Sequence, residues 1–464
     1  MIPALVIAGT GSGVGKTSIT LGLCRALTRR GVRVQPVKVG PDYLDPTHLT
    51  QAAGRLCWNL DPWMMGEAYV RELAASADAD LLLIEGVMGL YDGADAGRDD
   101  GSTAQVARLL DAPVWLVAEA AGAARSFAAT VRGFTTFPDA PRITGILANR
   151  CGSDRHVAVL REALASVGLP PLIGAIPKDG LPTLASRHLG LKAASDTTPL
   201  DTLTDAVERF VTLPDCTQKK KQDGEDGEDA GQPAHIGAAL NPSYPPHPVP
   251  TRSRFRLAVA WDAAFSFAYA DLWPALEQRG VAIVRFSPLS DAAVPEADGL
   301  YLPGGYPELH AATLAANSRM LASIRAFCAS GRTVYAECGG LMYLSQGILC
   351  TDGQRHALTG VLPVGTRMLP RRKALGYVEL TLTTATCIGS AGDLVRGHEF
   401  HYSELEADPA GWQSTYAVAY RRGERAREGW QRGNILATYV HLHLASRPAA
   451  LDAFVNHLRA RSPC

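Results

Sequence analysis

Residues 9–18, GTGSGVGKTS, combine glycines, a lysine and a hydroxyl residue in the order typical of a phosphate-binding loop. They match G-x-x-x-x-G-K-[ST] except at its first position, where Thr10 replaces glycine and Gly9 stands just before it. Glycines let successive N–H groups turn toward one anion, the lysine would neutralise phosphate charge, and the threonine would offer a hydroxyl to Mg²⁺. A glycine-rich turn between a strand and a helix, without a ligand, is the alternative. The predicted nucleotide-binding residues are Gly11, Gly13, Val14, Gly15, Lys16 and Thr17.

An acidic residue ends an apolar run in the segment DLLLIEGVMGLYDG, residues 80–93. The run predicts a buried strand that delivers Glu85 to the carboxyl edge of a parallel sheet, where ligands bind. A carboxylate at this edge, beside a phosphate loop, is well placed to hold Mg²⁺, and a capping or turn carboxylate is the alternative. Asp92 is a second acid predicted at the same edge.

A lysine and two acids lie together in VKVGPDYLDPTH, residues 37–48. Lys38, Asp42 and Asp45 follow or end a predicted strand, in a loop punctuated by glycine and proline. Such a loop can hold Mg²⁺ or position a carboxylate substrate. Because aspartate and proline are also routine turn residues, a purely structural turn stays open as the alternative.

A cysteine stands at a predicted sharp turn from strand to helix in VYAECGGLMYL, residues 334–344. The N-terminus of a helix can lower the pKa of a thiol toward the reactive thiolate, which makes Cys338 a candidate nucleophile. A second turn, in LYLPGGYPEL, contains Gly304 and Gly305, whose backbone N–H groups could stabilise an oxyanion together with that of Gly339. A buried cysteine that only fills space is the alternative.

Two histidines stand two residues apart in ATYVHLHLAS, at the end of a further predicted strand. Residues two apart on a strand share a face, so one ring, that of His441, would serve as general base to Cys338. His441 and His443 could instead bind a metal. The joint order of a Gly-Gly turn, a Cys-Gly-Gly turn and a late histidine strand favours a nucleophilic cysteine site.

Two blocks of alternating strands and helices must position these residues. In the first block the strands are ALVIAG, VRVQPVKVG, DLLLIEG, APVWLVAE and ITGILANR, and the helix KTSITLGLCRALTRRG ends at a capping Gly31. In the second they are FRLAVAWD, GVAIVRFSPL, ADGLYLPGG, GRTVYAECGG, HEFHYSEL and ILATYVHLHL. These patterns predict an α/β protein of two domains, each with a mostly parallel sheet flanked by helices. The predicted domains are residues 1–213 and 254–464, joined by a charged, Gly- and Pro-rich flexible linker at 214–253.

The overall composition narrows the class of protein. The chain of 464 residues has a formal net charge of −1, so no global field attracts nucleic acid or an anionic membrane. The start MIPALVIAGTG lacks the basic region of a signal peptide, and no apolar stretch approaches the length of a membrane span. Nine cysteines without a repeated spacing disfavour a disulfide framework and favour a cytoplasmic setting.

Taken together, the motifs resemble known families. The first block resembles the dethiobiotin-synthetase-like ATP-binding fold, and the second resembles the class I glutamine amidotransferase domain of the cobyric-acid-synthase type. The chain as a whole is similar to the cobyrinic acid a,c-diamide synthase family, and only the linker lies outside this resemblance. The segments that carry it are GTGSGVGKTS, VKVGPDYLDPTHL, IEGVMGLYDG, ANRCGSDRH, LPGGYPEL, AECGGLMYL and YVHLHL.

The resemblance implies amidation of the a- and c-carboxylates of cobyrinic acid through acyl phosphates, driven by ATP and L-glutamine, in cobalamin biosynthesis. Cys338 would attack the glutamine amide and release ammonia, with His441 as base. ATP with Mg²⁺ would phosphorylate the carboxylate of a corrinoid, and a homodimer stays open as an assembly. The implied roles are catalytic for Lys38 and Asp45, in the substrate loop for Asp42 and Asp92, metal-binding for Thr17 and Glu85, and base recognition for Asn149.

Three alternatives and one departure from the family pattern accompany this interpretation. The acceptor could be hydrogenobyrinic acid, or Ni-sirohydrochlorin on the coenzyme F430 route, and a non-catalytic P-loop switch protein is the alternative from another class. Many class I amidotransferases carry His-x-Glu, in which the glutamate orients the base. Here His443 stands in place of that glutamate, so the sequence leaves open which residue orients His441.

Overall fold

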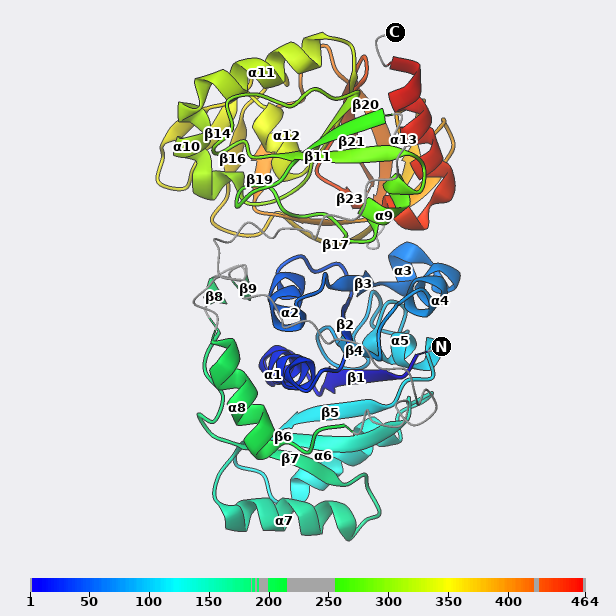
Figure 1. Ribbon diagram of the computed structural model, residues 1–464, viewed down its shortest axis with the longest axis vertical. Helices are drawn as coiled ribbons and strands as arrows, with labels where there is room; N and C mark the ends of the chain where they lie inside the picture. Colours follow the sequence, from blue (N-terminus) through cyan, green and yellow to red (C-terminus); the bar gives the residue numbers. More distant parts are fainter. Residues whose placement is uncertain are drawn as a thin grey trace, which may run out of the picture. The chain divides into compact units, whose positions relative to one another are not determined.

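The chain forms two units in the computed structural model, Met1–Tyr244 and Pro245–Cys464 (Figure 1). The structure describes residues 2–184, 186–187, 190–191, 199–214, 255–420 and 425–461. The predicted linker lies outside the described residues from 215 onward, so the predicted domain boundaries stay predictions. Within the described ranges, no helix is long and apolar enough to cross a membrane.

Seven strands of the first unit form one sheet in the order β3-β2-β4-β1-β5-β6-β7, and every neighbouring pair is parallel. Five of these strands lie where the sequence predicts them. The sequence did not predict β3, which has only three residues, or β7, whose apolar run is interrupted by a glycine. The strands are β1 (Ala4–Gly9), β2 (Val34–Val39), β3 (Trp58–Leu60), β4 (Leu81–Glu85), β5 (Val114–Glu119), β6 (Ile143–Cys151) and β7 (Leu172–Pro177).

Helices connect these strands and bury the apolar side chains of the sheet. Helix α1 ends where the sequence predicts, with Gly31 in the left-handed region at φ 78°. It packs closely on α8 because a Cβ at Gly22 would lie only 2.4 Å from Val207. The helices are α1 (Lys16–Arg29), α2 (Asp45–Ala53), α3 (Pro62–Met65), α4 (Glu67–Ala75), α5 (Thr103–Leu109), α6 (Arg125–Thr135), α7 (Asp154–Ala165) and α8 (Leu200–Phe210), and a small ladder joins β8 (Ser186–Arg187) to β9 (Gly190–Leu191).

The second unit is built on a ten-stranded sheet in the order β11-β10-β12-β13-β22-β21-β20-β17-β18-β23. The α/β class is confirmed, but the sheet is mixed: it is parallel from β11 to β22 and antiparallel from β22 to β23. The prediction of a mostly parallel sheet therefore holds for only one half. The strands are β10 (Phe255–Ala260), β11 (Val281–Phe286), β12 (Gly299–Leu302), β13 (Thr333–Glu337), β17 (Ala374–Leu382), β18 (Leu394–His401), β20 (Gln413–Tyr420), β21 (Arg425–Arg432), β22 (Ile435–Thr438) and β23 (His441–Leu442).

Two segments predicted as single strands are each divided between two strands. ILATYVHLHL forms β22 beside β13 and then β23 beside β18, at the far end of the sheet. The chain turns there because the buried carboxylate of Glu428 accepts hydrogen bonds from the Thr438 hydroxyl and from the Tyr439 N–H, the latter at 2.6 Å. HEFHYSEL likewise runs from β18 into β19 (Ser403–Leu405), which belongs to a second sheet.

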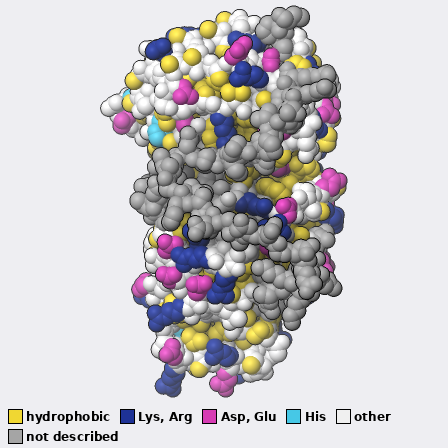
Figure 2. Space-filling view, viewed as in Figure 1, with side chains coloured by type: hydrophobic (Ala, Val, Ile, Leu, Met, Phe, Trp, Pro, Cys, Tyr) yellow, Lys and Arg dark blue, Asp and Glu magenta, His cyan; other side chains and the backbone are white. Residues whose placement is uncertain are grey.

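The remaining elements of the second unit flank these strands. The second sheet has four strands in the order β15-β14-β16-β19. On the face shown in Figure 2, acidic and basic side chains are interspersed. The other elements are β14 (Gly347–Leu349), β15 (Arg355–Ala357), β16 (Thr366–Met368), α9 (Leu272–Glu277), α10 (Ala311–Ala316), α11 (Ser318–Ala329), α12 (Gly339–Leu344), α13 (Pro448–Arg461), and the 3₁₀ turns η2 (Pro307–His310) and η3 (Leu444–Ser446).

Candidate functional site

The glycine-rich loop lies between β1 and α1, as the sequence predicts. Gly13 and Gly15 have φ angles of 77° and 102°, which residues with a side chain rarely adopt. A Cβ at Gly9 would lie 2.7 Å from Val14 and 2.9 Å from the Lys16 Cδ, so the close turn requires glycine one position before the pattern begins.

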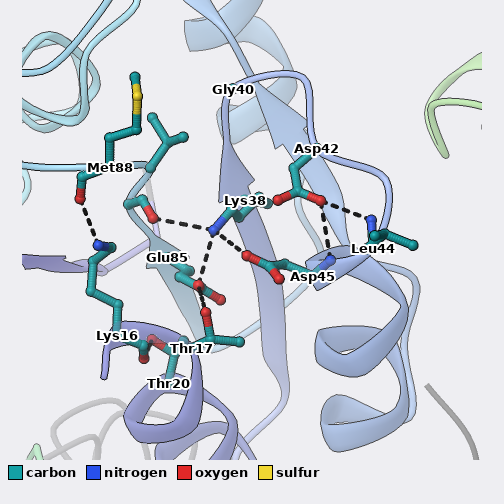
Figure 3. A network of polar contacts seen from close by, with 12 residues as sticks. Lys16, Thr17, Thr20, Lys38, Gly40, Asp42, Leu44, Asp45, Glu85 and Met88 are labelled. Carbon is teal, nitrogen blue, oxygen red and sulfur yellow. Dashed lines mark hydrogen bonds and ion pairs between the residues drawn. The ribbon is translucent and has the colours of Figure 1, made fainter. Parts of the chain in front are cut away.

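Lys16 connects the loop to the segment that follows β4. Its Nζ donates a hydrogen bond to the carbonyl of Gly11 at 2.8 Å. It also donates one to the carbonyl of Met88 at 2.5 Å (Figure 3). Burial, together with repulsion from the Lys38 ammonium, lowers the pKa of Lys16 to about 8. Lys16 therefore lies on the loop. A phosphate bound there would bring negative charge close to the ammonium group and stabilise its charged form.

Four side chains at the carboxyl edge of the sheet form a buried polar network. Glu85 Oε1 accepts a hydrogen bond from Thr17 Oγ1 at 2.5 Å and one from Lys38 Nζ at 2.9 Å (Figure 3). Lys38 Nζ also donates to Asp45 Oδ2 at 2.6 Å and to the Gly86 carbonyl at 3.2 Å. The structure thus brings together four residues that the sequence predicts from three separate motifs.

The charges in this network stabilise one another. Burial by itself lowers the pKa of Lys38, but Asp45 and Glu85 outweigh that effect and raise it. For Glu85, burial raises the pKa, and the attraction of Lys38 opposes this shift. Lys38 therefore stays an ammonium ion, which stabilises negative charge rather than accepting a proton.

Two other predicted acids hold turns of the backbone. Asp42 Oδ1 accepts hydrogen bonds from the N–H groups of Leu44 at 2.8 Å and Asp45 at 3.2 Å, at the start of α2. Burial and the neighbouring Asp45 raise the pKa of Asp42 to about 7. Asp92 Oδ2 accepts from the N–H of Gly89 at 2.7 Å. The contacts of both acids are thus those of turn residues, and their place in a substrate loop stays a prediction.

The predicted Mg²⁺ ligands, Thr17 and Glu85, lie within hydrogen-bonding distance of each other. Glu85 Oε2 is buried and has no hydrogen-bond partner among the described residues, so it has an oxygen to offer a cation. Mg²⁺ prefers oxygen ligands and is usually held by one or two protein groups together with substrate phosphates and water. The hydroxyl and carboxylate fit that requirement. In the described part of the chain, no group of three or more His, Cys, Asp or Glu residues could hold a metal ion.

Asn149, predicted for base recognition, is buried at the end of β6 against the phosphate loop. Its Nδ2 donates a hydrogen bond to the Val14 carbonyl at 2.8 Å, and its Oδ1 accepts one from the Arg150 N–H at 2.8 Å. A Cβ at Gly15 would lie 2.4 Å from that Nδ2. The observed contacts thus support the shape of the loop, and recognition of a base stays a prediction.

In the second unit, Cys338 lies between β13 and α12 at the predicted sharp turn. Its φ of 45° and ψ of −100° are unusual for a residue with a side chain, a strain of about 1–3 kcal/mol that is often found at functional residues. The N–H of Cys338 donates to the Thr438 carbonyl at 2.6 Å, and its Sγ lies 4.0 Å from the Phe400 carbonyl oxygen. The thiol is therefore held between two strands that come from distant parts of the sequence.

His441 is the histidine paired with this thiol. Burial alone lowers the pKa of His441, but the charge of Cys338 and the carboxylate of Glu337 outweigh it and raise the pKa to about 10. A thiolate beside an imidazolium is the reactive form of a cysteine nucleophile.

The predicted glycines lie against this pair. A Cβ at Gly304 would lie 2.3 Å from His441 Cε1, and one at Gly339 would lie 2.9 Å from the Gly305 nitrogen. A Cβ at Gly305 would lie 2.0 Å from the carbonyl oxygen of Ala264. The three glycines therefore allow the two turns and the imidazole to approach one another closely.

Replacing Gly304 with alanine is expected to displace His441 and to lower the rate of glutamine hydrolysis by about 100-fold, because a shift of about 1 Å in a catalytic group has that effect. The added methyl group would overlap the imidazole. Synthesis with ammonia in place of glutamine should be unchanged. The control is Gly133→Ala in α6, where a Cβ meets no atom within 4 Å. An unchanged glutaminase rate in Gly304→Ala would contradict this placement of the base.

Glu337, directly before the cysteine, is an acid that the sequence analysis missed. Its Oε2 lies 3.5 Å from His441 Nδ1, and both side chains are buried. The signal that could have revealed it is a carboxylate at the end of the apolar strand TVYAE. Position 443 carries a histidine and not an acid, as the sequence shows. Glu337, at the end of β13, instead lies beside the His441 base.

His443 has a carboxylate of its own. Its Nε2 lies 3.2 Å from Asp271 Oδ1, and its Nδ1 accepts a hydrogen bond from the Ser446 N–H at 3.2 Å. The two histidines therefore face different acids. This arrangement favours the base over the metal site that His-x-His left open.

Comparisons with known proteins identify a domain family in each half of the chain. The CobQ/CobB/MinD/ParA nucleotide binding domain matches residues 5–191, and the CobB/CobQ-like glutamine amidotransferase domain matches residues 256–449. A glutamine amidotransferase of known structure resembles the chain with a TM-score of 0.33 at 16% identity, over 44% of this chain and 98% of its own.

Full-length relatives are similar over nearly the whole chain. A cobyrinate a,c-diamide synthase of Syntrophotalea carbinolica is 51% identical over 99% of both chains. Another from Leptospira interrogans is 38% identical over 98% of both, and a hydrogenobyrinate a,c-diamide synthase of Rhodobacter capsulatus is 41% identical over 94% of this chain and 98% of its own. These similarities exclude the non-catalytic switch protein. The chain belongs to the cobyrinate a,c-diamide synthase family, whose members are ATP-binding, glutamine-dependent amide-forming ligases.

Proposed function

We propose that the protein converts the a- and c-carboxylates of cobyrinic acid to amides, using ATP and glutamine, through acyl phosphate intermediates. One observation carries this proposal: a single chain holds a phosphate loop beside a Lys38–Asp45 ion pair, and also a Cys338–His441 pair. The first arrangement suits activation of an acid, and the second suits release of ammonia from an amide. The expected cytoplasmic location and homodimer stay predictions.

In the glutaminase half, the Cys338 thiolate attacks the carbonyl carbon of the glutamine side chain. The resulting oxyanion is stabilised by the N–H groups of Gly305 and Gly339. The C–N bond then breaks, and the His441 imidazolium gives its proton to the departing nitrogen, which leaves as ammonia. Water, deprotonated by His441, hydrolyses the remaining thioester and releases glutamate.

In the synthetase half, an oxygen of the acceptor carboxylate attacks the γ-phosphorus of ATP, and ADP leaves with the electrons of the broken P–O bond. Lys16 and the ammonium of Lys38 stabilise the negative charge on the transferred group, and Asp45 holds Lys38 in place. Mg²⁺ bound by Thr17 and Glu85 would neutralise phosphate charge. Ammonia then attacks the acyl carbon, phosphate leaves, and loss of a proton gives the amide.

The identity of the acceptor rests on the relatives. Cobyrinic acid is supported by the 51% identical synthase, and hydrogenobyrinic acid is a second candidate because a relative named for that acceptor is 41% identical. Ni-sirohydrochlorin remains an alternative from the motifs alone.

An acceptor assay tests this proposal. Each of the three tetrapyrroles is incubated with the enzyme, ATP, Mg²⁺ and glutamine, and the amides gained are counted by mass spectrometry. Cobyrinic acid is expected to gain two amides, with one ATP hydrolysed for each. Amidation confined to either of the other acceptors would overturn the assignment, and absence of amidation with all three would overturn the proposed reaction. Omitting glutamine and ammonia together is the control.

A further inference from the structure

The nucleophile and an acid leave the same strand end. β13 stops at Glu337, and Cys338 follows in the strained turn described above. The side chain of Glu337 is directed to His441 Nδ1 at 3.5 Å. One strand therefore presents both the thiol and a carboxylate to a single imidazole, which comes from β23.

Three hydrogen-bond donors hold the Glu337 carboxylate in place. The Tyr335 hydroxyl donates to Oε1 at 2.6 Å, the Tyr301 hydroxyl donates to Oε2 at 3.0 Å, and the Leu442 N–H donates to Oε1 at 3.2 Å. The two phenol rings stack with centroids 5.5 Å apart. Burial, followed by the charge of Glu337, raises the pKa of both phenols well above the ordinary value, so both stay donors. These hydrogen bonds offset the free-energy cost of burying the carboxylate and fix its orientation.

The contact from Leu442 links the acid to the base through the backbone. Leu442 is the residue directly after His441, and its N–H points to the same carboxylate that lies beside the imidazole. Glu337 thus fixes both the backbone and the ring of the base. A carboxylate that binds the Nδ1 side of an imidazole also determines which ring nitrogen is free for proton transfer.

One further acid and histidine of this region, Asp271 and His443, are paired with each other. His443 lies against Asp271 and Ser446, and neither contact directs it toward His441. From β18, which pairs with β23, three further groups act electrostatically on His441. Burial and the charge of His441 lower the pKa of one of them, His398, to about 3, so that ring is neutral. The titratable or charged groups that act on His441 are Glu337, Cys338, His398, Glu399 and His401.

We propose that Glu337 is the positioning residue of His441 and takes the role that the missing His-x-Glu glutamate has in other class I amidotransferases. This inference rests on the proposed glutaminase function of Cys338. The acid has the same effect on the base, but it comes from the strand of the nucleophile rather than from the strand of the histidine.

A change of Glu337 to glutamine tests this role. The negative charge of Glu337 raises the pKa of His441, so its removal lowers that pKa, and the imidazolium is lost at a lower pH. The alkaline limb of kcat/KM for glutamine hydrolysis is therefore expected to move about 1–3 pH units lower. We expect kcat to fall by about 100-fold with little change in KM for glutamine. An alkaline limb at its wild-type position would overturn the proposal.

Two further variants separate positioning from structural support. Glu337→Asp keeps the charge but shortens the reach, so its alkaline limb should stay near that of the wild type while kcat recovers only in part. Full wild-type kcat in Glu337→Asp would also overturn the proposal. The matched control is Asp271→Asn, which makes the same acid-to-amide change beside the other buried histidine and should leave the pH profile unchanged.

The synthetase reaction distinguishes the failure of this inference from failure of the proposed function. Ammonia-dependent synthesis should be unchanged in all three variants, which also shows that they are folded. If Cys338→Ala hydrolyses glutamine at the wild-type rate, the proposed glutaminase is wrong. If Cys338→Ala is inactive with glutamine but Glu337→Gln keeps the wild-type pH profile, only the role of Glu337 is wrong.

Discussion

Replacing Cys338 with alanine is expected to lower glutamine-dependent synthesis by about 10⁴-fold or more, because the alanine side chain cannot form the thioester. Synthesis from ATP, acceptor and added ammonia should continue at the wild-type rate. Raised pH should increase that rate, since ammonia attacks the acyl phosphate and ammonium cannot. The measurement is amide formation with each nitrogen source, compared in parallel at several pH values.

A second buried thiol in the same unit provides the control for this variant. Cys387 is 4% exposed, and burial raises its pKa to about 12, so it is an inert space-filling side chain. Cys387→Ala should keep both activities. Full glutamine-dependent turnover in Cys338→Ala would show that the nucleophile lies elsewhere. Failure of that variant with concentrated ammonia would show that the cysteine also serves the synthetase step.

Replacing Lys16 with alanine is expected to impair synthesis with either nitrogen source and to leave glutamine hydrolysis intact. Synthesis should fall by about 10³-fold with glutamine and with ammonia alike, since the variant loses a buried ammonium that would stabilise the transferred phosphate. Glutamine hydrolysis does not use this residue and should continue. The two rates are measured on the same preparation, and a parallel loss of both would indicate unfolding or coupling instead of a local role.

The pH dependence of the same step gives a sharper test of Lys16. Its pKa is lowered to about 8, so in the free enzyme its charge is present below that pH and is lost above it. We therefore expect kcat/KM for ATP to decrease as the pH rises through about 8. Lys16→Arg cannot lose its charge in this range and should lack that decrease, whatever its absolute rate. A decrease that persists in Lys16→Arg would have to come from another group.

The sequence predicts those parts of both sites that depend on local chain geometry. The phosphate loop and the Cys338 turn each lie within a few residues of a strand end, so residue type and spacing suffice to predict them. The loop at Lys38 was undecided between a turn and a functional site. In the structure Asp42 caps the backbone and Asp45 pairs with Lys38, so the turn is confirmed and a functional role of the loop stays a prediction.

The parts that the sequence does not predict depend on contacts between distant segments. Glu337 became recognisable only when β23 was placed beside it, and β23 is separate from β22 because Glu428 caps the chain at Tyr439. Three strands of the antiparallel half, β17, β20 and β21, also escaped prediction. In β17, for example, buried residues alternate with partly buried ones, so the strand lacks the continuous buried runs of the parallel half.

Cys338 and His441 come from strands that differ in how many neighbouring strands they pair with. β13, which presents the thiol, has a neighbour on each side, whereas β23 is a two-residue strand at the margin of the sheet. Marginal strands open locally at a lower free energy than central ones. The contacts of Glu337 with the His441 ring and with the Leu442 N–H therefore anchor a strand that the sheet itself holds on one side only.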